Sequence, residues 1–272
     1  MEMQACDVLK QKQVFGTKEW AKYNENFISG CSYDCRYCYA KTMAVRFGRK
    51  TVETWKEENI DWKKLSKSFR KREGRFMFPT THDITPDTCY FCILFLKNIL
   101  EAGNEVLIVS KPHLECIRDM SRWLYQYREN ILFRFTVGSA DNQTLKFWDT
   151  YAPDFDERLE SLIYAHKSGF QTSISCEPML DDNADAVITT VLPYVTDAIW
   201  LGKVNQMTTR LKMNGHSDEE TMQRARQLID SQSNGYIFEL YKRHKDNPQI
   251  KWKESIKKVV GIEIPVESGL DI

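Results

Sequence analysis

The chain carries one stretch that decides most of its interpretation, Gly30-Cys31-Ser32-Tyr33-Asp34-Cys35-Arg36-Tyr37-Cys38-Tyr39-Ala40. It places three cysteines at the spacing Cys-x3-Cys-x2-Cys, directly after the apolar pair Phe27-Ile28. Cysteine thiolates at short loop spacings are the usual ligands of iron–sulfur clusters, so Cys31, Cys35 and Cys38 are candidate ligands of a cubane [4Fe–4S] cluster. No obvious fourth cysteine accompanies them, and one iron would therefore stay open to a small molecule.

The other readings of these cysteines are weaker. Zinc commonly takes four nitrogen or sulfur ligands, often as two separated pairs, and no suitable second pair stands out. A disulfide framework is uncommon in a chain of 272 residues with no secretion signal. Cys89-x-x-Cys92 lies in an apolar stretch predicted to be helical, where free cysteine behaves as a small hydrophobe, although a second metal or redox pair stays an alternative. Cys6 and Cys116 have no visible partner.

The longer pattern Cys-x3-Cys-x-Tyr-Cys-Tyr-Ala resembles the radical S-adenosylmethionine (SAM) superfamily. Within it, the pattern is similar to the branch of spore photoproduct lyase and the DNA repair photolyase-like proteins. The resemblance covers about residues 24–205, and Tyr37 belongs to its signature. It implies a [4Fe–4S] cluster whose open iron is chelated by the amino and carboxylate groups of SAM, and a reductant such as flavodoxin or ferredoxin.

Length and composition are those of an ordinary globular protein. The 272 residues fit one large domain or two small ones, and 42% of them are apolar and 28% charged. The N-terminus opens with polar residues, and the longest apolar run, residues 91–96, is far shorter than a membrane span. We therefore expect a cytoplasmic protein without membrane contact, whose cysteines serve as thiols or metal ligands.

The formal net charge is zero, but the charges are unevenly distributed along the chain. Residues 41–75 hold 12 Lys/Arg against 5 Asp/Glu, and residues 241–258 hold 7 against 2. Residues 141–200 hold 3 against 11. If the two basic segments meet in space, they could form a face that binds nucleic-acid phosphates. The alternative is that both are solvated helix faces.

A repeating order of short strand and helix predicts a parallel sheet. The expected strands span 26–29, 75–79, 105–110, 131–137, 171–176 and 198–201, and the expected helices span 39–47, 61–72, 87–102, 112–128, 154–168 and 183–194. This pattern predicts a partial (β/α)6 TIM-type barrel with a C-terminal helical extension, the fold that the resemblance also implies, although a doubly wound sheet fits the pattern too. The expected segments are an N-terminal stretch at 1–22, the barrel at 23–212 and the extension at 213–272.

Working residues of parallel barrels lie where the strands end, and this rule selects the candidate site. Polar groups follow each expected strand, in the runs 80–83, 110–112, 138–142, 175–178 and 202–205. On the strand 171–176, alternation puts Ser173, Ser175 and Glu177 on one face and Cys176 on the other. We therefore expect Glu177 to face the barrel interior and to be catalytic, with Cys176 packed against helices. His82 is a second catalytic candidate, with a structural role as the alternative.

The resemblance adds cofactor-binding candidates. In the photoproduct-lyase branch a Ser/Thr-Lys pair after the third strand contacts the SAM carboxylate, and Ser110-Lys111 matches it. Ser139 matches a serine that lies near the SAM methionine or ribose. Thr80 and Thr81 stand where many radical SAM enzymes carry Gly-Gly-Glu, whose backbone meets the SAM amino group, so here the chain departs from the pattern.

The resemblance predicts a radical SAM enzyme that reductively cleaves SAM to a 5′-deoxyadenosyl radical and abstracts hydrogen from a substrate. The branch favours a nucleic-acid base, DNA or RNA. However, photoproduct lyase has a catalytic cysteine at the end of its second strand, where this chain has Thr80-Thr81-His82-Asp83. The alternatives are a peptide or small-metabolite substrate, or a non-enzymatic iron–sulfur protein of electron transfer or sensing.

Overall fold

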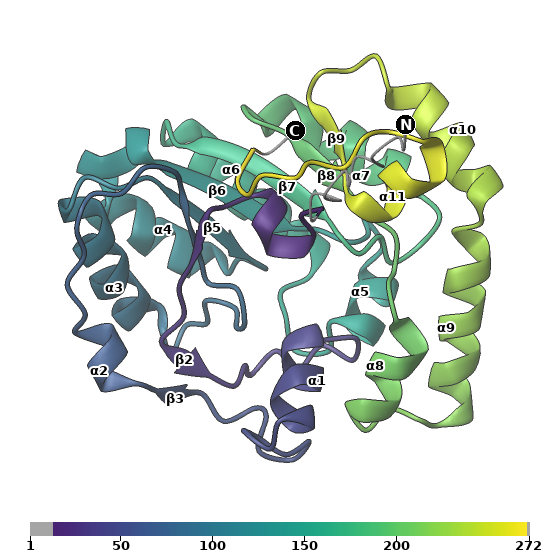
Figure 1. Ribbon diagram of the computed structural model, residues 1–272, viewed down its shortest axis with the longest axis horizontal. Coiled ribbons are helices and arrows are strands. Elements are labelled where there is room, and N and C mark those ends of the chain that lie inside the picture. Colours follow the sequence, from purple (N-terminus) through teal and green to yellow (C-terminus); the bar gives the residue numbers. More distant parts are fainter. Residues whose placement is uncertain (1–12, 271–272) are drawn as a thin grey trace, which may run out of the picture.

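Seven parallel strands form the main sheet of the computed structural model, which describes residues 13–270 (Figure 1). In sheet order they are β1 (Tyr23–Asn24), β4 (Phe76–Phe78), β5 (Val106–Ser110), β6 (Ile131–Thr136), β7 (Gln171–Cys176), β8 (Ile199–Leu201) and β9 (Ile250–Trp252). Sheet order follows chain order, and every neighbouring pair is parallel. This is the successive strand-and-crossover construction of a TIM-type barrel wall, as expected.

The helices of the barrel mostly match the predicted ranges. They are α1 (Tyr39–Arg46), α3 (Cys89–Glu101), α4 (Leu114–Trp123), α6 (Phe155–Lys167) and α7 (Ala184–Val191). The helix expected at 61–72 shrinks to α2 (Trp62–Leu65), because the charged residues beyond it offer no apolar face to bury. Two short helices were not predicted, α5 (Asn142–Trp148) and α8 (Met207–Met213). Short 3-10 turns occur at Gly16–Glu19 (η1), Tyr125–Asn130 (η2) and Leu192–Tyr194 (η3).

The first strand lies earlier than expected. The main-sheet strand is β1, whereas β2 (Ile28–Ser29) pairs antiparallel with β3 (Asn59–Ile60) in a separate ribbon. Phe27, which suggested the strand, instead stacks on Phe78 and packs against Phe95. The predicted segment thus does contain a strand, but this strand pairs with β3 outside the main sheet, while the Phe27 ring packs in the core.

The C-terminal extension is more than helical. It contains α9 (Glu219–Ser231), α10 (Asn234–His244) and α11 (Glu254–Val260), but β9 pairs in parallel with β8 and adds a seventh strand to the predicted six. The expected division at residue 213 is not tested by these contacts and stays a prediction. Cys6 lies outside the described residues.

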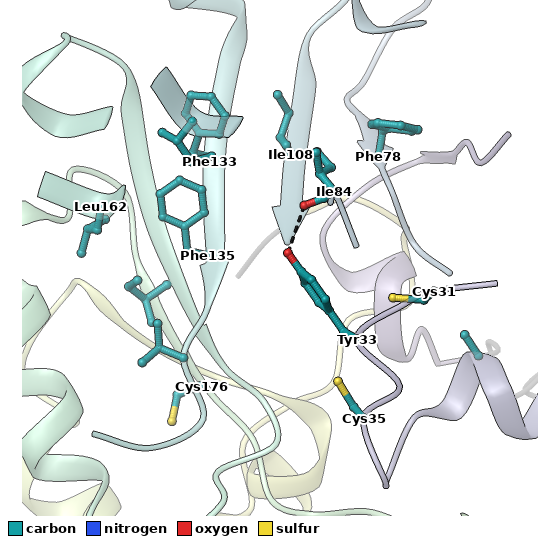
Figure 2. Packing of buried hydrophobic residues seen from close by; sticks show 14 of the residues in the cluster. Cys31, Tyr33, Cys35, Phe78, Ile84, Ile108, Phe133, Phe135, Leu162 and Cys176 are labelled. Carbon is teal, nitrogen blue, oxygen red and sulfur yellow. Dashed lines mark hydrogen bonds between the residues drawn. The ribbon is translucent and has the colours of Figure 1, made fainter. Parts of the chain in front are cut away.

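The two faces of the sheet differ in chemistry. The outer face packs against the helices in a large apolar core, which includes Phe78, Phe133 and Phe135 (Figure 2). The inner face carries a smaller cluster built on Trp20, Met77, Leu107, Leu132 and Trp200. The guanidinium of the fully buried Arg134 contacts the rings of both Trp20 and Trp200 and donates to Ser173 and Asp197. Apolar and aromatic side chains therefore fill part of the inner face of the sheet, whereas polar side chains line it along β7.

Both described ends of the chain meet beside the sheet. The Val14 amide donates to the Pro265 carbonyl at 2.9 Å, and the Gly269 amide donates to the Lys18 carbonyl at 2.8 Å. The turn η1 is therefore held by residues that follow α11. These two remote segments form one layer.

The basic segments do not combine into one face. Figure 1 shows α2 and β3 at the lower left of the molecule, and α10 and α11 at the upper right. Trp62 is exposed, but Trp55 and Trp252 are buried, and Phe69 packs on Phe76 and Phe95. Within residues 13–270, no helix has the length and apolar character needed to cross a membrane.

Candidate functional site

A cavity of about 540 Å³ lies at the ends of the parallel strands. It is lined by residues of the cysteine loop, of the turns that follow β4, β5, β7 and β8, and of the chain ends. Of the ten candidate residues nine line it: Cys31, Cys35, Tyr37, Cys38, Thr80, Thr81, His82, Lys111 and Glu177. The strand-end rule therefore selected residues that lie around one cavity, and their roles stay a prediction.

The cysteine loop is fixed by contacts that leave little freedom. A Cβ on Gly30, whose φ is +101°, would lie 2.1 Å from the Glu57 carbonyl oxygen, so only glycine fits there. The Tyr33 hydroxyl lies 3.2 Å from the carbonyl oxygens of both Ile84 and Lys111. Figure 2 shows this ring between Cys31 and Cys35, directed at the end of the strands. The loop is thus tied to the sheet through its own aromatic residue.

The far side of the loop is held by the extension. The Asn214 side-chain amide donates to the carbonyls of Arg36 (2.9 Å) and Cys38 (3.0 Å). Arg36 donates in turn to the Phe147 carbonyl and to the Thr221 hydroxyl. The three cysteines therefore sit in a preorganised frame.

The thiols themselves fit an iron–sulfur group. Burial raises the pKa of Cys31, Cys35 and Cys38, so the thiolates need a positive partner such as iron. The Lys41 amide donates to Cys38 Sγ at 3.4 Å at the start of α1, a contact of the kind that tunes cluster sulfurs. Among residues 13–270, no three Cys, His, Asp or Glu side chains converge on the position of a single metal ion.

Tyr37 anchors the loop from behind. Its hydroxyl donates to Asp149 Oδ1 at 2.6 Å, and Asp149 Oδ2 lies 3.0 Å from the Arg158 guanidinium. Asp149 and Arg158 have fully buried side chains. Burial opposes the charge of Asp149, but Lys111, Arg158 and the Tyr37 hydrogen bond together lower its pKa. Tyr37 thus lines the cavity with its ring fixed by a buried ion pair.

Lys111 faces the cysteine loop. Its Nζ lies 3.4 Å from Asp83 Oδ2, and Asp83 Oδ1 accepts the Lys111 amide at 2.7 Å. Burial alone would lower the pKa of Lys111, but the charges of Asp83, Cys35 and Tyr37 outweigh it and raise the pKa. Lys111 therefore stays a cation beside the loop, and Asp83 Oδ2 lies 4.0 Å from Cys31 Sγ.

Thr80 and Thr81 are positioned by Asn26. The side-chain Oδ1 of Asn26 accepts from both threonine backbone amides, at 2.7 and 3.0 Å, and its Nδ2 donates to the Thr80 hydroxyl. The Tyr39 hydroxyl donates to the Thr80 carbonyl. The backbone groups of Thr80 are thus already engaged, and Thr81 is the freer of the two toward the cavity.

His82 lies in an aromatic environment. Its ring contacts Phe27 and Phe78 edge-on, and Nδ1 is 2.9 Å from the Asp83 carbonyl. Burial lowers the pKa of His82 to about 4, so the imidazole is neutral at physiological pH. These contacts favour a role in shaping the turn that carries Asp83.

Glu177 points inward, as the alternation along β7 predicted. Ser175 and Glu177 line the cavity, whereas Cys176 is fully buried in the outer core. Burial raises the pKa of Glu177, although Lys253 opposes this with an ammonium 3.5 Å from Oε2. Glu177 therefore belongs to a charged group at the inner end of the cavity.

Ser139 is not brought to the site. It is fully buried, donates to Asp181 and accepts the Asp141 amide at 2.8 Å, and it does not line the cavity. Its contacts explain it as a loop residue. Cys89 and Cys92 lie buried in α3, as the apolar pattern indicated, with Cys89 Sγ 3.8 Å from the Cys116 carbonyl.

Sequence reasoning missed several residues of the cavity. Trp20 precedes the cysteine motif by about ten residues, Glu254 lies far beyond it in sequence, and Arg210 comes from the unpredicted α8. Lys253, which the charge count assigns to a basic segment, does not line the cavity, and its side chain is fully buried next to Glu19. None carries a local motif, so only the folding together of the chain ends could reveal them.

Comparisons with known proteins place this geometry in context. No family model matches the chain. An uncharacterized protein of Methanocaldococcus jannaschii is 25% identical over 167 residues, which are 61% of this chain and 63% of that protein. An uncharacterized protein of Acidianus two-tailed virus is 24% identical over 170 residues, 58% of this chain and 56% of that protein. The matches thus span less than two thirds of the length of both relatives.

Solved structures of spore photoproduct lyase resemble the fold. A mutant of that enzyme with bound AdoMet and dinucleoside spore photoproduct aligns with a TM-score of 0.56 and 12% identity, over 90% of this chain and 79% of that chain. The complex with dinucleoside spore photoproduct alone gives a TM-score of 0.55 and 11% identity over the same shares. At this identity the likeness concerns the fold. The chain therefore has a fold similar to that of spore photoproduct lyase.

Proposed function

We propose that this protein is a radical SAM enzyme that holds a [4Fe–4S] cluster through Cys31, Cys35 and Cys38. The observation that carries the proposal is that all three cysteines, held in one rigid loop, line a cavity at the strand ends that is also lined by a buried cation, Lys111. When bound, the cluster and SAM supply one-electron cleavage of the sulfonium and a carbon radical that abstracts hydrogen.

The chain's own residues bind and orient the reactants. Lys111 offers its ammonium to the SAM carboxylate, because charge-assisted hydrogen bonds are the strong ones. Asp83 Oδ2 lies 3.4 Å from Lys111 Nζ and therefore competes with the SAM carboxylate for this ammonium. We propose that Asp83 accepts a hydrogen bond from the SAM amino group when Lys111 binds the carboxylate. Tyr37, held by Asp149, keeps the loop in place, and Thr81 closes the side of the cavity next to Asn26.

The inner part of the cavity is left for the substrate. Glu177 lies there, and we propose that it contacts the substrate as an acceptor or proton-holding group. We propose a nucleic-acid base as the substrate, because the branch that this chain resembles includes an enzyme solved with a dinucleoside lesion. The departure at Thr80–Asp83 argues against the same lesion chemistry. A peptide or small metabolite is the alternative substrate.

Anaerobic reconstitution tests the proposed function directly. The protein should bind about four iron per chain, as one cubane requires, and SAM with dithionite should yield 5′-deoxyadenosine even without substrate. Lys111→Ala should weaken SAM binding while the iron content stays intact. A preparation that takes up iron but neither binds nor cleaves SAM would favour an electron-transfer or sensor protein, and one that holds only zinc would refute the cluster.

Nucleic-acid binding is tested separately. Since the basic segments lie apart, we expect only weak, salt-sensitive binding through residues 41–75, where Lys63, Lys64 and Arg72 are exposed. Charge reversal at Lys63 and Lys64 should weaken binding of single- and double-stranded DNA and RNA about equally, because phosphate contacts do not read sequence. Anisotropy titrations at low and high salt measure this. No binding at tens of micromolar protein would move the substrate to the peptide or metabolite class.

A further inference from the structure

The helix α8 is tied to the cysteine loop and lies beside α1 (Figure 1). At its end, the Asn214 side-chain amide donates to the carbonyls of Arg36 and Cys38. The Asn214 side-chain oxygen accepts from the Thr42 hydroxyl of α1 at 2.9 Å. Arg210 stands one helical turn before Asn214, and its carbonyl accepts the Asn214 backbone amide at 2.9 Å. Both side chains therefore leave α8 on the face that is turned to the cysteine loop.

Most charged side chains of the cavity wall already have a partner of opposite charge: Asp34 pairs with Lys41, Asp83 with Lys111 and Glu177 with Lys253. Arg210 also lines the cavity, but within residues 13–270 its guanidinium makes neither a hydrogen bond nor an ion pair. The cavity wall thus contains a cation whose donors are not engaged by the described chain.

The guanidinium of Arg210 is accessible. The side chain is partly buried, and none of its nitrogens is among the buried polar atoms that lack a partner in the described part of the chain, so these nitrogens keep accessible surface. Four titratable side chains act on its charge, and all of them line the same cavity: Cys38, Glu177, Tyr39 and Tyr37. Burial lowers the pKa of Arg210, and the charges of these four groups oppose this. The guanidinium therefore lies beside the cavity and can be reached from it.

An unpaired guanidinium in a cavity wall limits the chemistry of its ligand. Arginine stays charged in proteins, and its five N–H donors form a planar fork that fits two oxygens of one anion, above all a phosphate or a carboxylate. Lys111, beside Asp83 at the end of β5, is a second and separate cation, which is proposed above to bind the SAM carboxylate. Arg210 is therefore left for an anionic group of the substrate.

The neighbourhood of Arg210 favours a phosphate over a peptide carboxylate. Phe15 and Tyr39 also line the cavity, and their rings are 45% and 42% exposed. Aromatic rings on which a base can stack, together with a cation for the backbone, are the usual means of holding a single nucleic-acid strand. A nucleotide offers both groups, because a phosphate lies next to each base.

We infer that Arg210 forms a phosphate-binding subsite of the cavity, and that the substrate is accordingly a nucleotide or an oligonucleotide and not a free base or nucleoside. This inference rests on the proposed function for its choice of a base. It adds to that function the anionic group that the substrate must carry and the residue that binds it.

The test compares the five common nucleosides with their 5′-monophosphates, which differ from them only by the phosphate. The protein is loaded with cluster and SAM under anaerobic conditions without reductant, and binding is measured by isothermal titration. The 5′-monophosphate that binds most tightly should bind about tenfold more tightly than its own nucleoside, as expected for a hydrogen bond between charged groups. A wild type that binds both forms equally, or neither at millimolar concentration, would overturn the inference.

Variants of Arg210 assign the effect to this residue. Arg210→Gln should reduce the preference for the 5′-monophosphate to less than about twofold, whereas Arg210→Lys keeps the charge without the fork and should retain part of it. Lys212→Ala removes an exposed cation of the same helix that does not line the cavity, and this matched control should leave the preference unchanged. Unfolding midpoints show whether each variant is folded, and Arg210→Met replaces Arg210→Gln if the latter is not. A preference that survives in the folded variant without the charge would refute the subsite.

Titration with SAM separates this subsite from the cofactor site. Arg210→Gln should leave SAM affinity within about twofold of the wild type, whereas Lys111→Ala should weaken it. A loss of SAM affinity in Arg210→Gln would assign the guanidinium to the cofactor and overturn the inference. Iron content and the 5′-deoxyadenosine assay without added nucleotide report on the proposed function alone, because neither requires Arg210.

Discussion

One side of the cavity is formed by the cysteine loop, a single short segment of sequence. The other side is formed by residues near the two ends of the chain. The loop puts Cys31, Cys35, Tyr37 and Cys38 within eight residues, so a motif reveals it. The side formed by the chain ends joins residues from opposite ends of the chain, and Lys253 and Gly16 are separated by 237 positions. The proposed cluster ligands are therefore encoded locally, whereas the opposite side of the cavity depends on the whole fold.

The largest expected effect separates these two regions by iron content. Cys35→Ala should abolish iron loading, because a cubane held by two thiolates has lost a third of its protein ligands. Lys253→Met, at the other end of the cavity, should leave about four iron per chain. Iron and acid-labile sulfide analysis after anaerobic reconstitution measures both. Iron loss in Lys253→Met, with the fold intact, would show that the two regions are not independent.

A second comparison sets the buried ion pair behind the loop against an exposed one. Asp149→Ala leaves the Arg158 guanidinium, whose side chain is fully buried, without its carboxylate, and should cost about 3–5 kcal/mol of unfolding free energy. Asp185 pairs with Arg243 at the surface, and Asp185→Ala should cost at most about 1 kcal/mol. Urea unfolding measures both. Equal costs would mean that Asp149 does not hold the loop.

The pH dependence of stability tests the buried charged group of Glu19 and Lys253, which lies beside the chain-end side of the cavity. Burial, opposed by Lys253, raises the pKa of Glu19 from 4.5 to about 7. Between these values the unfolded chain releases a proton that the folded chain keeps, so stability falls as the pH rises from about 4.5 to about 7. Glu19→Gln should remove up to about 3 kcal/mol of that fall, at 1.36 kcal/mol per pKa unit. Urea unfolding at several pH values measures it, and identical pH profiles would contradict the raised pKa.

The smallest effect is expected for the cysteines of α3. The double variant Cys89→Ala, Cys92→Ala should load the same iron as the wild type, because both thiols are buried in the outer core. Its stability should fall by about 1 kcal/mol per residue, as for small core truncations. Iron analysis and thermal unfolding check the two effects. Loss of iron beyond the error of the assay would reveal a second cluster.

Parts of the fold that follow from periodicity were predictable. The predicted strand at 171–176 has the observed bounds. Its residues alternate between two faces and lie between the end of a helix and a polar turn, so only one assignment of the inward and outward faces fits. The first strand of the main sheet was misplaced, because residues 28–29 do form a strand but pair with β3 in a separate ribbon, while β1 takes the place beside β4. The short helices α5 and α8 were not predicted, because seven residues show too little periodicity to distinguish a helix from a loop.

The candidate site divides in the same way. Alternation along β7 placed Glu177 inside the cavity and Cys176 outside it, a purely local inference. The count of charged residues assigned Lys253 to a basic segment at the surface. Composition cannot show that this lysine turns inward and contacts Glu19 and Glu177. Ser139 follows a strand like the other candidates, yet its hydroxyl is engaged by Asp181 and the Asp141 amide.

The sequence by itself determined the parallel strand-and-helix order and the three cysteines of one loop, since both depend on residues a few positions apart. The tertiary structure decided the seventh strand, which pairs with β8, and the burial of Lys253. The burial of Lys253 arises where segments more than 200 residues apart come together, as Gly16 and Lys253 do. Burial and pairing across such distances depend on the folded chain, and no local pattern encodes them.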